Sequence, residues 1–196
     1  MLQHLPSRVR DAIAQPNARR AHALAHGLTH WLSSGERVLD IGAGHGFVAQ
    51  AIAKRGCVVT ALDVRNTSFV PDLPVQIYDG RTIPFGADAF DAALLITVLH
   101  HIPDPDATLR EAARVASKII ILEDLVESPA ERAFTHFADS WLNWEWRGHP
   151  HSNRSDADWR ATFAGLNLRV AHASQTIHTF FPFRFRHGLY VLESRP

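Results

Sequence analysis

The stretch Val38–Ala49, with the sequence VLDIGAGHGFVA, decides the fold of this chain. A short apolar strand pattern runs into three closely spaced glycines, and a helical pattern follows at once. Glycine lets the backbone turn sharply and approach a ligand closely. The helix after the glycines directs its first N–H groups and the positive end of its dipole toward that ligand. Because nucleotide-like cofactors dock at such turns in open α/β sheets, the stretch predicts a cofactor-binding strand–loop–helix unit.

An acidic residue follows the glycines at the distance expected for ribose binding. The segment Cys57–Asp63 is apolar and β-branched, which is typical of a buried strand, and its last residue lies 21 positions after Gly42. A carboxylate about 20 positions past the first glycine can accept hydrogen bonds from ribose hydroxyls. Either feature alone is compatible with an ordinary tight turn or strand end. Together they favour a cofactor site that includes Asp63.

Phe47 decides between two kinds of cofactor. The dinucleotide fingerprint G-x-G-x-x-G/A requires a small sixth residue, and here that position holds Phe47. A bulky ring obstructs the close approach of helix and strand that a glycine permits. The chain also contains only Tyr78 and Tyr190, and neither belongs to a Tyr-x-x-x-Lys pair. An NAD-dependent oxidoreductase is therefore the second choice.

The rest of the chain alternates between strand and helix patterns, which predicts an α/β fold with a parallel sheet covered on both faces. The expected strands are Val75–Tyr78, Phe90–Ile96, Lys118–Glu123, Leu168–Ala173 and Leu189–Leu192. The expected helices are Arg8–Ala14, a second one that begins at Asn17 and ends before Gly35, Pro105–Ala116 and Asp156–Phe163. Pro16 is expected to end the first helix. The alternation of Phe and Arg over Phe180–Arg186 favours a hairpin over a nucleic-acid surface.

Length and composition narrow the class of protein. The 196 residues fit one domain, 1–196, with N-terminal helices in 1–35. Basic and acidic residues are equal in number, 20 each, so the chain provides no general positive field for nucleic acid. Cys57 is the single cysteine, which is compatible with a reducing cytoplasm. No apolar run has the length of a signal peptide or a membrane span. We therefore expect a cytoplasmic protein that does not bind nucleic acid and has no membrane span.

Four segments in order resemble the class I S-adenosylmethionine-dependent methyltransferases. They are residues 38–49, the strand end ALDV at 61–64, the segment DGRTIPF at 79–85 followed by Phe90-Asp91, and LITVLHHI at 95–102. The resemblance covers about residues 37–124 and is to the broad subgroup that contains ubiquinone and menaquinone biosynthesis methyltransferases. It implies a Rossmann-like three-layer sandwich with a seven-stranded, mostly parallel sheet. The last strand of that sheet is antiparallel and lies beside the sixth.

The same resemblance implies S-adenosylmethionine as cofactor and assigns its binding residues. These are Asp40, Gly42, Ala43, Gly44, Asp63, Val64, Asp79, Gly80, Thr97 and Val98. In the family pattern the glycine loop approaches the methionine part, and Asp40 holds that loop or binds the cofactor's amino group. Asp63 binds the ribose and Asp79 the adenine amino group. Thr97 and Val98 line the wall near the sulfonium.

Methyl transfer from a sulfonium requires little chemistry from the protein. The leaving group is already activated by its charge, so the protein mainly aligns the acceptor and excludes water. A general base is needed only for an acceptor that is protonated at the working pH. If a base is used, His101 or His136 is the hypothesis. Alternatively, His100 and His101 are structural residues that cap the following helix.

An aromatic insertion at about 129–154 interrupts the alternation of strands and helices. We interpret it as a lid that faces a small, partly apolar acceptor, because aromatic side chains supply apolar walls. The candidate substrate-binding residues are Trp144, Trp146, His149 and Arg154. The spacing of the His and acidic residues matches no metal-site signature, so no metal is expected. A third hypothesis is a non-catalytic protein that binds the cofactor or a partner.

Overall fold

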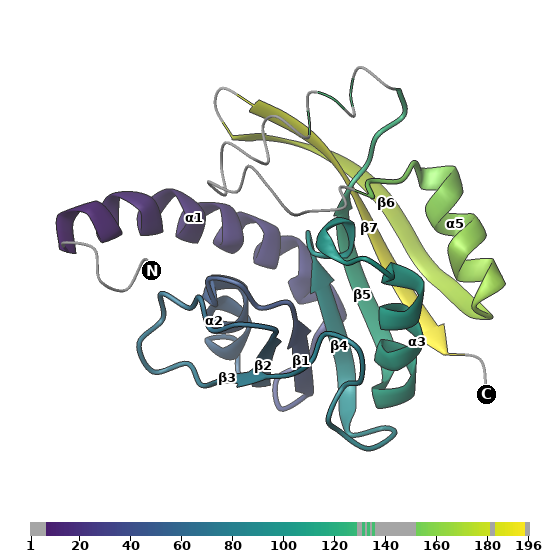
Figure 1. Cartoon of the computed structure of the whole chain (residues 1–196), viewed down its shortest axis with the longest axis horizontal. Helices are drawn as coiled ribbons and strands as arrows, with labels where there is room; N and C mark the ends of the chain where they lie inside the picture. Colours follow the sequence, from purple (N-terminus) through teal and green to yellow (C-terminus); the bar gives the residue numbers. More distant parts are fainter. Residues whose placement is uncertain are drawn as a thin grey trace.

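The computed structural model describes residues 7–128, 131, 133, 135, 152–180 and 183–194. Its elements alternate as the sequence predicts (Figure 1). The strands are β1 (Arg37–Ile41), β2 (Val58–Asp63), β3 (Val75–Ile77), β4 (Phe90–Ile96), β5 (Ala116–Asp124), β6 (Leu168–Phe180) and β7 (Phe183–Ser194). The helices are α1 (Ser7–Leu28), α2 (Phe47–Ala53), α3 (Pro105–Val115) and α5 (Asp156–Gly165), with short 3-10 helices η2 (Thr29–Trp31) and η3 (Leu99–His101).

The seven strands form one sheet in the order β3-β2-β1-β4-β5-β7-β6. The neighbours from β3 to β5 are parallel, and β7 runs antiparallel to both β5 and β6. This arrangement confirms the predicted fold, including the antiparallel last strand beside the sixth. The chain reverses its direction of winding between β1 and β4, and ligands bind outside the carboxyl ends of the strands at such a switch point.

Helices cover both faces of the sheet (Figure 1). One core cluster joins the sheet to α3 and α5 and contains Leu109, Trp159 and Phe163. The other joins the sheet to α1 and α2 and contains Leu24 and Ile52. The central strands are buried on both faces, which explains why β4 is continuously apolar from Ala92 to Ile96 instead of alternating.

The predicted break at Pro16 is wrong, because the two N-terminal helices predicted on either side of it form one helix, α1, which is continuous from Ser7 to Leu28 and contains Pro16. A proline inside a helix removes one hydrogen bond and crowds the carbonyl four residues earlier. Tertiary packing can nevertheless override such a local preference. Here the second half of α1 buries Leu24 and Leu28 against the sheet, and the helix continues through the proline.

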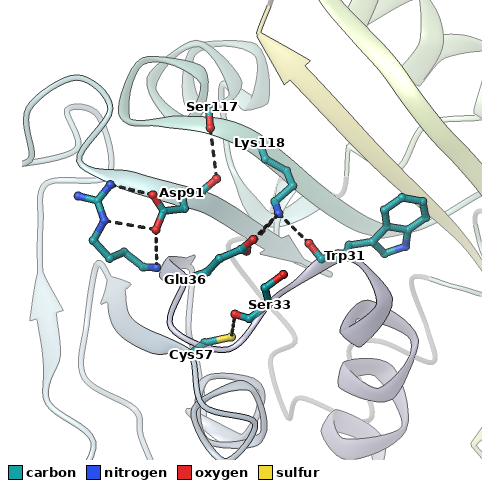
Figure 2. Close-up of polar contacts among 8 residues, drawn as sticks. Trp31, Ser33, Glu36, Cys57, Asp91, Ser117 and Lys118 are labelled. Atoms are coloured by element: carbon teal, nitrogen blue, oxygen red, sulfur yellow. Dashed lines mark hydrogen bonds and ion pairs between the residues drawn. The ribbon is translucent and has the colours of Figure 1, made fainter.

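Ion pairs and hydrogen bonds tie the amino ends of the strands together (Figure 2). Lys118 Nζ donates to the Trp31 carbonyl oxygen at 2.7 Å and contacts the Glu36 carboxylate at 3.1 Å. Arg37 pairs with Asp91 at 2.8 Å. This network lies at the amino ends of the strands, on the side of the sheet opposite the glycine loop. It stabilises the pairing of the strands there and leaves their carboxyl ends for a ligand.

The last two strands are longer than the sequence predicts. They pair from Leu168↔Ser194 to Phe180↔Phe183, which confirms the predicted hairpin. The sequence pattern detected only the parts of these strands that continue the buried sheet.

Among the residues that the structure describes, no helix combines the length and the hydropathy needed to cross a bilayer.

Candidate active site

The glycine loop leaves β1 and turns back against two neighbouring strands. The N–H groups of Gly42 and Ala43 donate to the Leu62 carbonyl oxygen at 2.8 and 3.1 Å. Gly42 has a φ of +74°, a conformation that side chains with a Cβ rarely adopt. A Cβ built on Gly42 lies 2.2 Å from Val98 Cγ2. The loop therefore packs directly against the segment that follows β4.

Asp63 links the end of β2 to the glycine loop. Its Oδ2 accepts a hydrogen bond from Gly44 N at 2.8 Å, and its Oδ1 accepts from Arg65 N at 3.2 Å. Thr67 Oγ1 donates to the Gly44 carbonyl oxygen at 3.1 Å from the other side. The predicted ribose-binding carboxylate thus lies beside the loop that is predicted to approach the methionine part.

Phe47, which argues against a dinucleotide fingerprint, is the first residue of α2 and packs outside the strand–helix contact. Its ring is parallel to that of Phe69, with centroids 6.2 Å apart, and Phe69 N donates to the His45 carbonyl oxygen at 3.0 Å. The segment after β2 therefore lies against the outer side of the glycine loop through Phe69. A small residue at position 47 would remove this ring contact and leave Phe69 only the His45 ring, 4.9 Å away centroid to centroid, of the two.

An apolar surface lies next to Asp63 on the side where the family pattern places adenine. Val64 is 55% exposed, which is unusual for its type, and its Cγ1 is 3.1 Å from a Cβ built on Gly80. Asp79 Oδ1 accepts hydrogen bonds from Thr82 N and Arg81 N at 2.9 and 2.8 Å. These bonds lower the pKa of Asp79, so its carboxylate remains an acceptor.

Asp40 carries a buried carboxylate beneath the loop. Its side chain is 2% exposed, and no described residue donates a hydrogen bond to its Oδ2. Burial raises the pKa of Asp40 to about 7, and the nearby charge of Asp63 adds to this effect. A buried carboxylate oxygen without a donor is unfavourable. The donor that it lacks matches the amino group of the methionine part of S-adenosylmethionine, so this residue fits the predicted cofactor.

A fully buried carboxylate that the sequence reasoning missed shapes the loop after β4. Glu123 Oε1 accepts from Val98 N and Leu99 N, both at 2.7 Å, and Glu123 Oε2 is 2.6 Å from His100 Nδ1. Thr97 has a φ of +50°, a strained value for a β-branched residue. Glu123 holds the three residues that follow Thr97 in place, namely Val98, Leu99 and His100. The only signal in the sequence is an acidic pair at the end of an apolar strand.

We expect Glu123→Gln to lower the free energy of unfolding by about 1–3 kcal/mol, because an amide offers only one acceptor oxygen, without charge, to the three buried groups that the carboxylate contacts. Denaturant titration measures the change. Glu36→Gln serves as the matched control, because that carboxylate forms a partly exposed pair with Lys118 and its loss costs at most about 1 kcal/mol. Equal effects of the two substitutions would contradict the assigned role of Glu123.

The two adjacent histidines have different environments. The His100 ring is buried and lies 4.0 Å from the His101 ring, centroid to centroid, and His101 is half-buried. Neither caps the following helix, so the capping part of the alternative is wrong, whereas His100 is a buried structural residue that contacts Glu123. Asp104 caps α3 instead, with its side chain accepting from Ala107 N at 2.9 Å. His101 is therefore the more exposed histidine of the pair.

Most of the predicted acceptor-binding residues, and the second candidate base, lie outside the described residues: His136, Trp144, Trp146 and His149. Arg154 is described, and its guanidinium bridges two helices. It pairs with Asp106 of α3 at 2.9 Å, donates to Thr162 of α5 and lies over the Trp159 ring.

Within the described part of the chain, no three His, Cys, Asp or Glu residues are grouped as metal ligands.

Three contacts join the predicted cofactor-binding residues into one site. Gly42 packs on Val98, Gly44 bonds to Asp63, and Val64 packs on Gly80. These residues lie at the carboxyl ends of β1 to β4, with Asp40 buried below them. The arrangement is that of a class I methyltransferase.

Comparison with known proteins gives the same result. Residues 10–173 match the family described as "Methyltransferase domain". The chain therefore belongs to this methyltransferase family. A ubiquinone biosynthesis O-methyltransferase from Alkalilimnicola ehrlichii is 28% identical over 121 residues, which are 55% of this chain and 49% of that one. A demethylmenaquinone methyltransferase from Corynebacterium efficiens is 36% identical over 88 residues, 43% of this chain and 38% of that one. The chain thus matches about half or less of the length of these relatives.

Solved structures share the fold. The magnesium protoporphyrin IX methyltransferase of Synechocystis with bound SAH superposes with a TM-score of 0.66 and 15% identity, over 97% of this chain and 89% of that one. A SAM-dependent methyltransferase from Aquifex aeolicus gives a TM-score of 0.62 and 17% identity, over 90% and 98%. At these identities the likeness extends to the architecture alone.

Proposed function

We propose that this protein transfers a methyl group from S-adenosylmethionine to a small-molecule acceptor. The observation that carries the proposal is the buried, unpartnered Asp40 oxygen beneath a glycine loop that Asp63 holds in place. Membership of the methyltransferase family supports it. The relatives named for ubiquinone and menaquinone biosynthesis support a small acceptor. The equal numbers of acidic and basic residues favour such an acceptor over a nucleic acid.

In this proposal each part of the cofactor has its own residues. Asp40 accepts from the amino group, Asp63 from the ribose hydroxyls and Asp79 from the adenine amino group, while Val64 and Gly80 lie along the adenine ring. The cofactor supplies an electrophilic methyl group when bound. Thr97, whose N–H donates to the Leu122 carbonyl oxygen, and Val98, held by Glu123, form the wall beside it and exclude water. Alignment of the acceptor then accounts for most of the rate enhancement.

Calorimetric titration with S-adenosylmethionine, S-adenosylhomocysteine and NADH tests the cofactor. We expect the first two to bind, and Asp63→Ala to weaken them by about 10- to 100-fold, because a charged hydrogen-bond acceptor is lost. Asp72→Ala is the control, since Asp72 is exposed on the loop between β2 and β3. Preference for NADH, or equal binding by both variants, would contradict the proposal and favour the oxidoreductase.

We further propose His101 as the general base for an acceptor with an ionisable hydroxyl, because His101 is half-buried beside the wall formed by Thr97 and Val98. His101→Asn should reduce turnover by about 10²- to 10⁴-fold with unchanged cofactor affinity. Formation of S-adenosylhomocysteine on a panel of acceptors provides the measurement, and His30→Asn, at an exposed position, the control. Full activity of the His101 variant would leave His136 as the candidate.

A further inference from the structure

Tyr78 lies at the end of β3, between the two carboxylates that are assigned to the adenosine part of the cofactor. It directly precedes Asp79, and its N–H donates to the Asp63 carbonyl oxygen at 3.1 Å. Its backbone is therefore fixed to the end of β2 on one side and continues into the Asp79 turn on the other. A ligand that reaches from Asp63 to Asp79 passes this position.

The ring of Tyr78 is supported by the core. Tyr78 is partly buried and packs against the core cluster that contains Leu62 and Ile83. Val98, which belongs to the wall proposed to lie beside the sulfonium, packs against the same cluster. The ring therefore has a fixed place at the carboxyl ends of the strands, on the side of the sheet that the Val98 wall also faces.

The hydroxyl of Tyr78 remains available to a ligand. No described residue forms a hydrogen bond with it, and it is not among the oxygen atoms that are shielded from solvent. Burial raises the pKa of this hydroxyl, and the charges of Asp63 and Asp79 raise it further. Both carboxylates therefore lie near the hydroxyl end of the side chain, and the hydroxyl stays protonated at neutral pH.

We propose that Tyr78 contacts the adenine base and determines which cofactors fit, because its side chain closes the pocket beside the amino group of the base. This inference rests on the proposed function, which places the ribose at Asp63 and the adenine amino group at Asp79. A base between these two acids has the Tyr78 side chain beside it. The side chain leaves room for the hydrogen atoms of the amino group but not for a larger substituent.

Ile77 shows that this placement is particular to Tyr78 and not to the strand. Ile77 is 51% exposed, and its strand β3 is the edge strand of the sheet. Successive side chains along a strand point to opposite faces. Tyr78, which directly follows β3, packs on the core cluster, whereas the Ile77 side chain remains largely in solvent. Ile77 therefore provides a matched control one residue away.

Calorimetric titration of S-adenosylhomocysteine and of its N6-benzyl analogue into the full chain tests the proposal. The benzylated amino group keeps one N–H for Asp79, so the two ligands differ mainly in size. We expect the unaltered protein to bind the analogue at least about tenfold more weakly, because overpacking a filled site is unfavourable. Tyr78→Ala should remove this discrimination. It should also weaken S-adenosylhomocysteine itself by about fivefold or more, because a contact between an aromatic ring and the base is lost.

Further variants separate a cofactor contact from a loss of packing. Ile77→Ala should leave both affinities unchanged. Tyr78→Leu keeps an apolar contact with the core cluster and removes the outer part of the ring, so it should reduce the discrimination with a smaller loss of stability than Tyr78→Ala. Denaturant titration of each variant shows that the protein used in the calorimeter is folded.

The outcomes distinguish this inference from the function on which it rests. Absence of S-adenosylhomocysteine binding to the unaltered protein contradicts the proposed function and this placement with it. If S-adenosylhomocysteine binds and the unaltered protein accepts the benzyl analogue equally well, Tyr78 does not close the pocket. If the folded Tyr78 variants weaken both ligands by the same factor, Tyr78 is a packing residue without a role in specificity.

Discussion

Gly42→Ala is expected to lower the free energy of unfolding by about 2–4 kcal/mol and to abolish measurable cofactor binding. Two independent effects add. The backbone at Gly42 has a φ of +74°, which strains any residue with a Cβ, and the new Cβ lies 2.2 Å from Val98 Cγ2. Relief of that contact requires the glycine loop or the Thr97–Val98 wall to move, and both are predicted to contact the cofactor. Denaturant titration and calorimetry measure the two effects.

A double-mutant cycle separates the strain from the contact. Val98→Ala in the Gly42→Ala background removes the clashing methyl groups but not the backbone strain, so we expect it to restore part of the stability. Gly86→Ala is the control for the loss of a glycine, since its φ is not positive and its Cβ meets nothing within 4 Å. A simple sum of the two single effects would show that Gly42 and Val98 do not interact.

The cofactor half of the site could be predicted from the sequence because its residues follow the strands at fixed positions. The carboxyl ends of parallel strands meet at one edge, so Asp40, Gly42 and Asp63 had to lie close together once the order of the strands was known. The hairpin of the last two strands followed from a different local pattern, the alternation of Phe and Arg over Phe180–Arg186.

The interactions that support the site were not predictable in this way. Glu123 contacts the chain about 25 residues earlier, and Asp124 meets His187 only because β7 lies between β5 and β6. Neither pairing follows from spacing along the chain. The continuity of α1 through Pro16 also depends on packing against the sheet, which outweighs the local preference of a proline.

Three buried acids therefore lie at one edge of the sheet, and each has a different state. Glu123 is satisfied by three hydrogen bonds, Asp124 is ionised beside His187, and Asp40 lacks a donor at Oδ2. Buried carboxylates are costly unless they are paired. Asp40 is thus the one of these three acids with a raised pKa and a missing donor, and it lies where a bound ligand can donate that hydrogen bond. Perturbed pKa values are common at functional sites.

The state of Asp40 gives the stability a defined pH dependence. Its pKa is raised from 3.8 to about 7 in the folded protein, so the folded state binds more protons than the unfolded state between these values. Its contribution to stability is therefore full below about pH 4 and is lost as the pH rises to about 7. We expect Asp40→Asn, which cannot ionise, to lack this decline and to be more stable than the unaltered chain at pH 8, by up to about 4 kcal/mol. Denaturant titrations at pH 5 and pH 8 measure the difference.

Cofactor binding should reverse this effect and release a proton. If the amino group of S-adenosylhomocysteine lies against Asp40, it favours the ionised carboxylate and returns the pKa toward its ordinary value. Binding at pH 6.5 should then release roughly half a proton or more, seen as a dependence of the calorimetric enthalpy on the ionisation enthalpy of the buffer. Asp40→Asn should bind more weakly and release no proton from this site. If the two proteins show the same buffer dependence, Asp40 does not contact the amino group and serves only to hold the glycine loop.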